Sequence, residues 1–253
     1  MIRTLAIAAY LAAPVPLLAQ AAAVVPITSE PSHHLALTTD RVRVFDVTAA
    51  PHATTLIHRH DHDYLFVTLG DADITSARTD APPTRLVLKD GTLEFAPGAF
   101  AHSVANNIDR PFHNITIELL QASTHVSPCA DACAEPPVPC TTGSHCAAAT
   151  RLFTADQWVA NRITLQPGDV WTADADRAPS LAVVVTQSNL ALKGEYETTA
   201  DTHRSPGNLI WMPQRAGRRA RPGGYVMQAV TPAITNTGSQ PATIVVVQWA
   251  KAG

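Results

Sequence analysis

The sequence predicts an all-β protein built from two tandem barrels. Short apolar runs, many of them β-branched, alternate with turn-forming Gly, Pro, Asp and Asn at the spacing typical of sandwiches and barrels. No long stretch has the periodicity of an amphipathic helix. The runs that we interpret as strands are, in order, 42–47, 54–57, 65–69, 85–88, 115–120, 163–165, 181–185, 209–212 and 244–249.

The two halves of the chain resemble each other. The pairs that match at an offset of 116 residues are 47–52 with 163–168, 65–67 with 181–183, and 95–97 with 211–213. Farther along, Asn106 matches Asn236 at an offset of 130, so the second copy is longer by 14 residues. Repetition of this kind predicts two copies of one β domain.

Residues 1–21 have the layout of a secretory signal peptide. One positive charge at Arg3 precedes the apolar run 5–18, and small residues stand at Ala19 and Ala21. The run is shorter than the roughly 20 residues that a spanning helix needs, so we expect no membrane span. We expect cleavage after Ala21 and a secreted, periplasmic mature chain. The formal net charge of -3 predicts no nucleic-acid partner.

Residues 122–150 have no hydrophobic pattern, so we expect a linker there, between an N-terminal barrel in 22–121 and a C-terminal barrel in 151–253. The linker contains all four cysteines of the chain, Cys129, Cys133, Cys140 and Cys146. Because exported proteins meet oxidising conditions, two disulfides are predicted, and their pairing stays open. A zinc site that adds His125 or His145 is the alternative, which the lack of a C-x-x-C pair disfavours.

Histidines alternate along one stretch of the first half, at His58, His60 and His62. Residues two apart in a strand share a face, so these imidazoles can converge on one metal ion. His102 follows a Pro-Gly turn and can bring a further imidazole from a neighbouring strand.

These residues resemble the two motifs of the cupin superfamily, G-x5-H-x-H-x(3,4)-E-x6-G and G-x5-P-x-G-x2-H-x3-N. The positions that keep the spacing of the second motif are Gly91, Pro97, His102 and Asn106. The motif's inner glycine is displaced, because Gly98 precedes the expected position and Ala99 occupies it. In the first motif, Tyr64 stands where the family has Glu.

The resemblance implies two double-stranded β-helix (jelly-roll) barrels, the first holding one divalent transition metal on His58, His60 and His102. Without the Glu the ligand set is neutral, which favours ions that accept imidazole, so Fe, Zn, Ni, Cu or Mn are the candidates. A ligand set with His62 in place of His58 stays open. Tyr64 or Asp63 is then expected to act as acid, base or hydrogen-bond donor toward a ligand.

The second copy lacks this set of residues. At the offset of 116, Asp174 and Asp176 replace the first two histidines, and Arg218 or Pro232 replaces the third. We therefore expect one metal centre in a bicupin with a degenerate C-terminal barrel. The histidines without partner spacing, interpreted as surface or packing residues, are His33, His34, His113 and His203.

Two functions are compatible with the sequence. The first is a metalloenzyme that acts on a small molecule, such as a dioxygenase, because the superfamily includes such enzymes. The second is a non-catalytic protein that binds a metal or small ligand, or a structural bicupin that forms a homodimer; the missing Glu and the degenerate second copy favour it. Fold alone does not separate the two.

Overall fold

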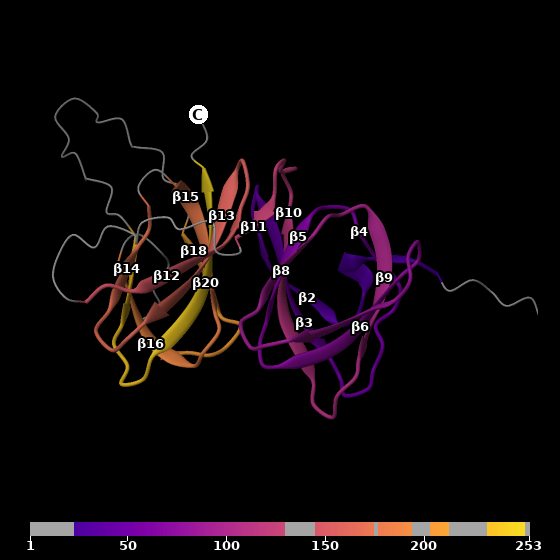
Figure 1. Cartoon of the computed structure of the whole chain (residues 1–253), viewed down its shortest axis with the longest axis horizontal. Helices are drawn as coiled ribbons and strands as arrows, with labels where there is room; N and C mark the ends of the chain where they lie inside the picture. The colour runs from indigo at the N-terminus through magenta and orange to yellow at the C-terminus, as the bar shows by residue number, and fades with distance from the viewer. Residues whose placement is uncertain (1–22, 130–144, 175–176, 194–202, 213–231, 251–253) are drawn as a thin grey trace, which may run out of the picture.

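Two β-barrels lie side by side, the N-terminal one in indigo to magenta and the C-terminal one in orange to yellow (Figure 1). The structure, a computed structural model, describes residues 23–129, 145–174, 177–193, 203–212 and 232–250. The predicted signal peptide 1–21 lies outside these residues, as do Cys133, Cys140, Asp176 and Arg218. Within them, no helix has the length and hydrophobicity needed to cross a bilayer.

The N-terminal barrel consists of two five-stranded sheets. The first has the order β1 (Val25–Pro26), β4 (His58–His60), β9 (Phe100–Asn106), β6 (Ala72–Arg78) and β7 (Thr84–Leu88). The second has the order β2 (His33–Thr38), β3 (Val42–Ala49), β10 (Phe112–Leu119), β5 (Tyr64–Thr68) and β8 (Leu93–Ala96). A short 3-10 turn, η1 (Ile27–Ser29), connects β1 to β2.

The C-terminal barrel also has two sheets. The six-stranded sheet has the order β11 (Ser127–Pro128), β12 (Ala148–Thr154), β13 (Trp158–Leu165), β20 (Ala242–Ala250), β15 (Arg177–Val184) and β18 (Leu209–Met212). The four-stranded sheet has the order β14 (Val170–Thr172), β19 (Ala233–Asn236), β16 (Ser188–Lys193) and β17 (His203–Arg204). This all-β architecture confirms the predicted fold class.

Strand register reproduces the internal repeat. Val47 pairs with Asn114 between β3 and β10, and Ile163 pairs with Ile244 between β13 and β20. These pairs are related by the two offsets found in the sequence, 116 for the first strand and 130 for the second. Because pairing register decides which side chains face inward, equivalent positions of the two barrels can be compared directly.

Strands β10 and β5, in the middle of the second sheet, are buried on both faces. Outward side chains of this sheet, such as Val44 and Ile117, join Trp158 and Val247 of the other barrel in one hydrophobic cluster. In β10 the apolar residues Ile115, Ile117 and Leu119 alternate with Thr116 and Glu118, so its outward face is apolar although its inward face is polar. The cluster joins the two barrels through their apolar sheet faces.

The inward faces of the two barrels differ in polarity. Along β10 the inward residues are Asn114, Thr116 and Glu118, and the equivalent residues of β20 are Ile244, Val246 and Gln248. The second barrel is filled by a hydrophobic cluster that includes Trp171 and Met212. Polar groups are therefore concentrated inside the first barrel, and the second has an apolar core. The described residue Asp174 is exposed, away from that core.

Neither Cys129 nor Cys146, the two cysteines within the described residues, carries a free thiol. The pairing of the four cysteines involves Cys133 and Cys140, so it stays a prediction.

The displaced glycine of the second motif has a structural explanation. A Cβ on Gly98 would overlap the backbone carbonyl group of His62, so only glycine fits there. Ala99 has φ +64°, in the left-handed region where glycine is usual. Two adjacent positions thus favour glycine, and this chain has it at only one of them.

We expect Ala99→Gly to stabilise the protein by about 0.5–1 kcal/mol. Left-handed backbone costs an L-residue roughly 1–2 kcal/mol, and the added flexibility of the unfolded chain offsets part of that gain. Urea unfolding at unchanged m-value measures the difference. Gly98→Ala is the matched comparison, expected to destabilise because backbone must move; a destabilising Ala99→Gly would contradict the explanation.

Candidate metal centre

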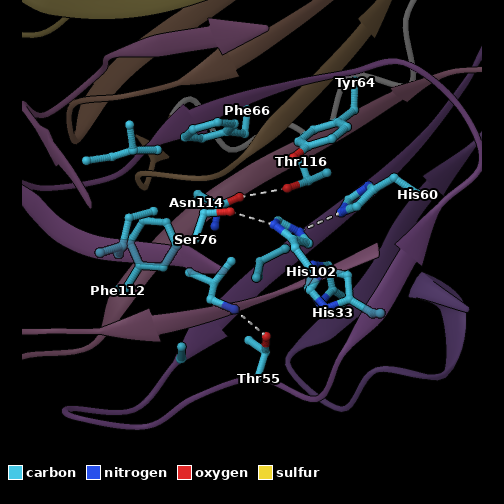
Figure 2. A pocket seen from close by; sticks show the side chains of 16 residues that line it. His33, Thr55, His60, Tyr64, Phe66, Ser76, His102, Phe112, Asn114 and Thr116 are labelled. Atoms are coloured by element: carbon cyan, nitrogen blue, oxygen red, sulfur yellow. Dashed lines mark hydrogen bonds between the residues drawn. The ribbon is translucent and has the colours of Figure 1, made fainter. Parts of the chain in front are cut away.

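A pocket opens inside the N-terminal barrel (Figure 2). Its volume of about 70 Å³ is several times the roughly 10–15 Å³ that one water molecule needs, which suits a small ligand. The side chains that line it are His33, Val47, Ala49, Thr55, His58, His60, Tyr64, Phe66, Ile74, Ser76, Leu86, His102, Val104, Phe112, Asn114 and Thr116. No Lys or Arg is among them.

The three histidines predicted as ligands lie together in this pocket. His58 pairs directly with His102 across the antiparallel strands β4 and β9, and their ring centroids are 4.6 Å apart. His60 follows on the same face of β4, as the alternation predicted. All three are buried, with 1%, 1% and 6% of their surface exposed.

The imidazoles of His60 and His102 face each other through their Nε2 atoms, which are 3.2 Å apart. Figure 2 shows both rings turned toward the same point as His33, while Phe66 and Phe112 lie at the other end of the pocket. Two ligand nitrogens bound to one ion at about 2.0–2.1 Å each are separated by no more than about 4.2 Å. The His60–His102 distance fits within that limit.

The outer nitrogens of these rings are held by neighbouring groups. His58 Nδ1 lies 2.9 Å from the carbonyl oxygen of Leu56, which can only accept, so His58 Nδ1–H donates and its Nε2 keeps a lone pair. His102 Nδ1 lies 2.8 Å from the hydroxyl of Ser76. Ring nitrogens fixed in this way leave the opposite nitrogen free to bind a metal.

Glu118 is a buried carboxylate behind His60 that sequence reasoning missed. Its Oε2 accepts a hydrogen bond from Arg43 Nε at 2.9 Å, while its Oε1 lies 4.0 Å from His60 Nδ1. Neither Oε1 nor His60 Nδ1 has another hydrogen-bond partner. A small rotation of either side chain would join them. Its sequence signal was a Glu inside an apolar strand, at the same parity as Asn114 and Thr116.

The three imidazoles are neutral over the physiological pH range. Burial, the larger cause, and repulsion from neighbouring histidines together lower the pKa of His58 to about 4, of His60 to about 2 and of His102 to about 3. Neutral imidazole is the form that binds a metal. At neutral pH these three imidazoles can therefore bind an ion without first losing a proton.

His33 corrects the sequence interpretation, which treated it as a surface or packing residue. It is the first residue of β2, and it pairs with Val47. Ligand atoms of His33, His58 and His60 all lie within 4.8 Å of one another. The motifs could not indicate it, because β2 lies upstream of both. The only signal in the sequence was Glu30, three residues earlier, at a spacing that a tight turn can close.

His62 lies outside this group because the strand ends before it. Strand β4 stops at His60 and β5, in the other sheet, starts at Tyr64, so alternation does not extend across residues 61–63. His62 is half-buried and is not among the lining residues. The geometry therefore favours His58 over His62 as a ligand.

Tyr64 lines the pocket, whereas Asp63 does not. The phenol ring stacks on the imidazole of His60, with ring centroids 4.0 Å apart, and burial raises the pKa of its hydroxyl. The Asp63 carboxylate instead accepts a hydrogen bond from the Gly98 backbone N–H at 2.8 Å. Tyr64 is thus placed to donate to a ligand. For Asp63 the structure gives a role in the turn, and its chemical role stays a prediction.

The residues present fit a metal ion. The unpartnered Nδ1 of His60 and the short contact between its Nε2 and that of His102 are both explained by an ion between the rings, with Nδ1–H directed at Glu118. The spread of up to 4.8 Å in the group with His33 exceeds the ligand limit by several tenths of an ångström, which small ring movements can close.

Both barrels have the cupin fold, and histidines converge inside the first of them. No family model and no curated protein matches the sequence. The chain is similar to AerE from Microcystis aeruginosa, at 10% identity and a TM-score of 0.54, over 88% of this chain and 99% of that one. It is also similar to salicylate 1,2-dioxygenase from Pseudoaminobacter salicylatoxidans in its adducts with gentisate, at 12% identity and a TM-score of 0.51, over 82% and 68%.

Proposed function

We propose that this protein is an exported bicupin that holds one divalent transition metal in its N-terminal barrel and oxidises a small molecule there with dioxygen. The observation that carries the proposal is the group of buried, neutral imidazoles at one wall of an apolar pocket. His58, His60 and His102 would hold the ion. When bound, an ion such as Fe supplies a Lewis-acidic, redox-active centre.

The chain's own residues then bind and orient the ligand. Phe66, Phe112 and Val104 form an apolar wall that packs against a ring and excludes water. The Thr116 hydroxyl donates to Asn114 Oδ1 at 2.8 Å, which leaves the Asn114 amide protons for a ligand oxygen. No hydrogen bond to the Tyr64 hydroxyl occurs among the described residues, so it too can donate to a ligand.

These walls suit a small aromatic or dicarbonyl ligand with adjacent oxygens. Because no Lys or Arg lines the pocket, the ion would be the group that attracts the ligand's negative oxygens. The similar salicylate 1,2-dioxygenase was determined with gentisate, a ligand of this chemistry. That likeness supports the choice of test compounds.

A second function is favoured by one observation. With His33 included, four imidazoles surround the site, enough to fill a four-coordinate ion. An ion with no open position would make the protein a metal carrier or a metal-stabilised binding protein. An ion that accepts six ligands would keep positions open for a substrate.

Metal content and oxygen uptake separate the two functions. The mature chain is purified from the periplasm without a histidine tag and analysed for metals; about one ion per chain is expected. Iron-loaded protein is then tested in an oxygen electrode with salicylate, gentisate, catechol and acetylacetone. Uptake with one of them supports the enzyme, metal without uptake supports the binding protein, and a chain that binds no divalent ion contradicts both.

A further inference from the structure

Glu30 and His33 form a buried pair at the edge of the metal site. His33 Nδ1–H donates to Glu30 Oε2 at 2.6 Å, and the two side chains have only 5% and 2% of their surface exposed. The ring of His33 lies close to His58, with centroids 4.6 Å apart. Its outer nitrogen is therefore held by a carboxylate, and its Nε2 is left for the site.

Glu30 is anchored by further hydrogen bonds. The backbone N–H of Ser32 donates to its Oε2 at 2.8 Å, and the backbone N–H of Leu56 donates to its Oε1 at 3.2 Å. Leu56 also accepts the hydrogen bond from His58 through its carbonyl oxygen. The Glu30 carboxylate thus contacts His33 directly. It also contacts the backbone N–H of Leu56, the residue whose carbonyl oxygen orients His58.

The Glu30–His33 pair would add negative charge to a metal site whose other ligands are neutral. The ligands expected from the motifs are neutral, because Tyr64 stands where the family has Glu. Glu30 accepts hydrogen bonds from His33 and from two backbone amides, and donors of this kind stabilise the carboxylate form. A carboxylate behind a ligand imidazole makes the imidazole a stronger donor.

We propose that His33 is a fourth metal ligand and that Glu30 supplies, through it, the negative charge that the Tyr64 position lacks. The N-terminal strand β2 thereby becomes part of the metal site. This inference rests on the proposed metal centre. It assigns to Glu30, a residue outside both motifs, the supply of negative charge that Tyr64 does not provide.

The test is a cobalt titration of five metal-free proteins: wild type, His33→Ala, His33→Asn, Glu30→Gln and His34→Ala. Co²⁺ is the probe because its visible absorption reports coordination number and ligand type. His34 is the matched control, since it is the next residue of β2 and is exposed. Urea unfolding of each metal-free variant verifies that it is folded, and the asparagine variant keeps a polar group should alanine unfold the strand.

Both His33 variants are expected to weaken Co²⁺ binding by roughly 100-fold and to change the visible spectrum, and His34→Ala to match wild type. Glu30→Gln is expected to weaken binding by about 10-fold while keeping most of the spectrum, because it removes charge and not a ligand. Folded His33 variants with wild-type affinity and spectrum would overturn the inference and leave the proposed function standing. Absence of Co²⁺ binding by the wild type would overturn both.

Discussion

Replacing His58 or His102 with alanine is expected to abolish tight metal binding. Structural zinc sites gain about 10–16 kcal/mol from roughly four ligands, so one ligand contributes about 3 kcal/mol, or roughly 100-fold in affinity. Both side chains are buried and lack a substitute donor at the same position. Zn²⁺ competition titrations with a chromophoric chelator measure the loss, and metal analysis after purification should fall from about one ion per chain to near zero.

Two further variants make the experiment discriminating. His62→Ala should bind metal as wild type does, because His62 lies in the connection between β4 and β5. The Glu118→Gln variant should bind the metal roughly 10-fold more weakly, because the substitution removes the charge behind His60 and keeps every ligand. If His62→Ala lost the metal while His58→Ala kept it, the alternative ligand set of His60, His62 and His102 would hold instead.

Part of this site was predictable from local sequence and part was not. His58, His60 and His102 were predicted because strand alternation and motif spacing both act within single strands or tight turns. His33 was not, because it contacts His58 across the barrel interior, between strands of two different sheets that no sequence motif connects. The same limit applies to Glu118, whose role depends on which face of β10 points into the barrel.

Tyr64 was singled out by motif spacing, and the structure gives its position a different physical basis. The alternation of His58 and His60 ends with β4, and residues 61–63 separate that strand from β5. Tyr64 still lies in the pocket, because β5 crosses to the second sheet and its ring stacks on His60 from there. For the second barrel, the apolar residues Ile244 and Val246 could have indicated a packed core, had the register of β20 been known.

The metal-free protein is expected to lose about 4 kcal/mol of stability between pH 7.5 and pH 5.5. Burial holds the pKa values of His58, His60 and His102 at about 4, 2 and 3, below the value of 6.5 that each has when exposed. The unfolded chain therefore binds up to three more protons than the folded chain, so stability falls as the pH drops below 6.5. Each histidine contributes about 1.4 kcal/mol over the whole interval from pH 7.5 to pH 5.5.

Urea unfolding in the presence of a chelator at the two pH values measures this loss. The double variant His58→Ala with His102→Ala leaves one of the three buried histidines, so its loss should be about one third as large. Glu118 acts in the opposite direction, because burial raises the pKa of its carboxyl and its uptake of a proton favours the folded chain in acid. The pH range in which Glu118 affects stability lies at lower pH, closer to 4.5, the ordinary pKa of its carboxyl group. Equal losses in wild type and double variant would show that these imidazoles are not buried in neutral form, and the electrostatic argument for the metal site would fail with them.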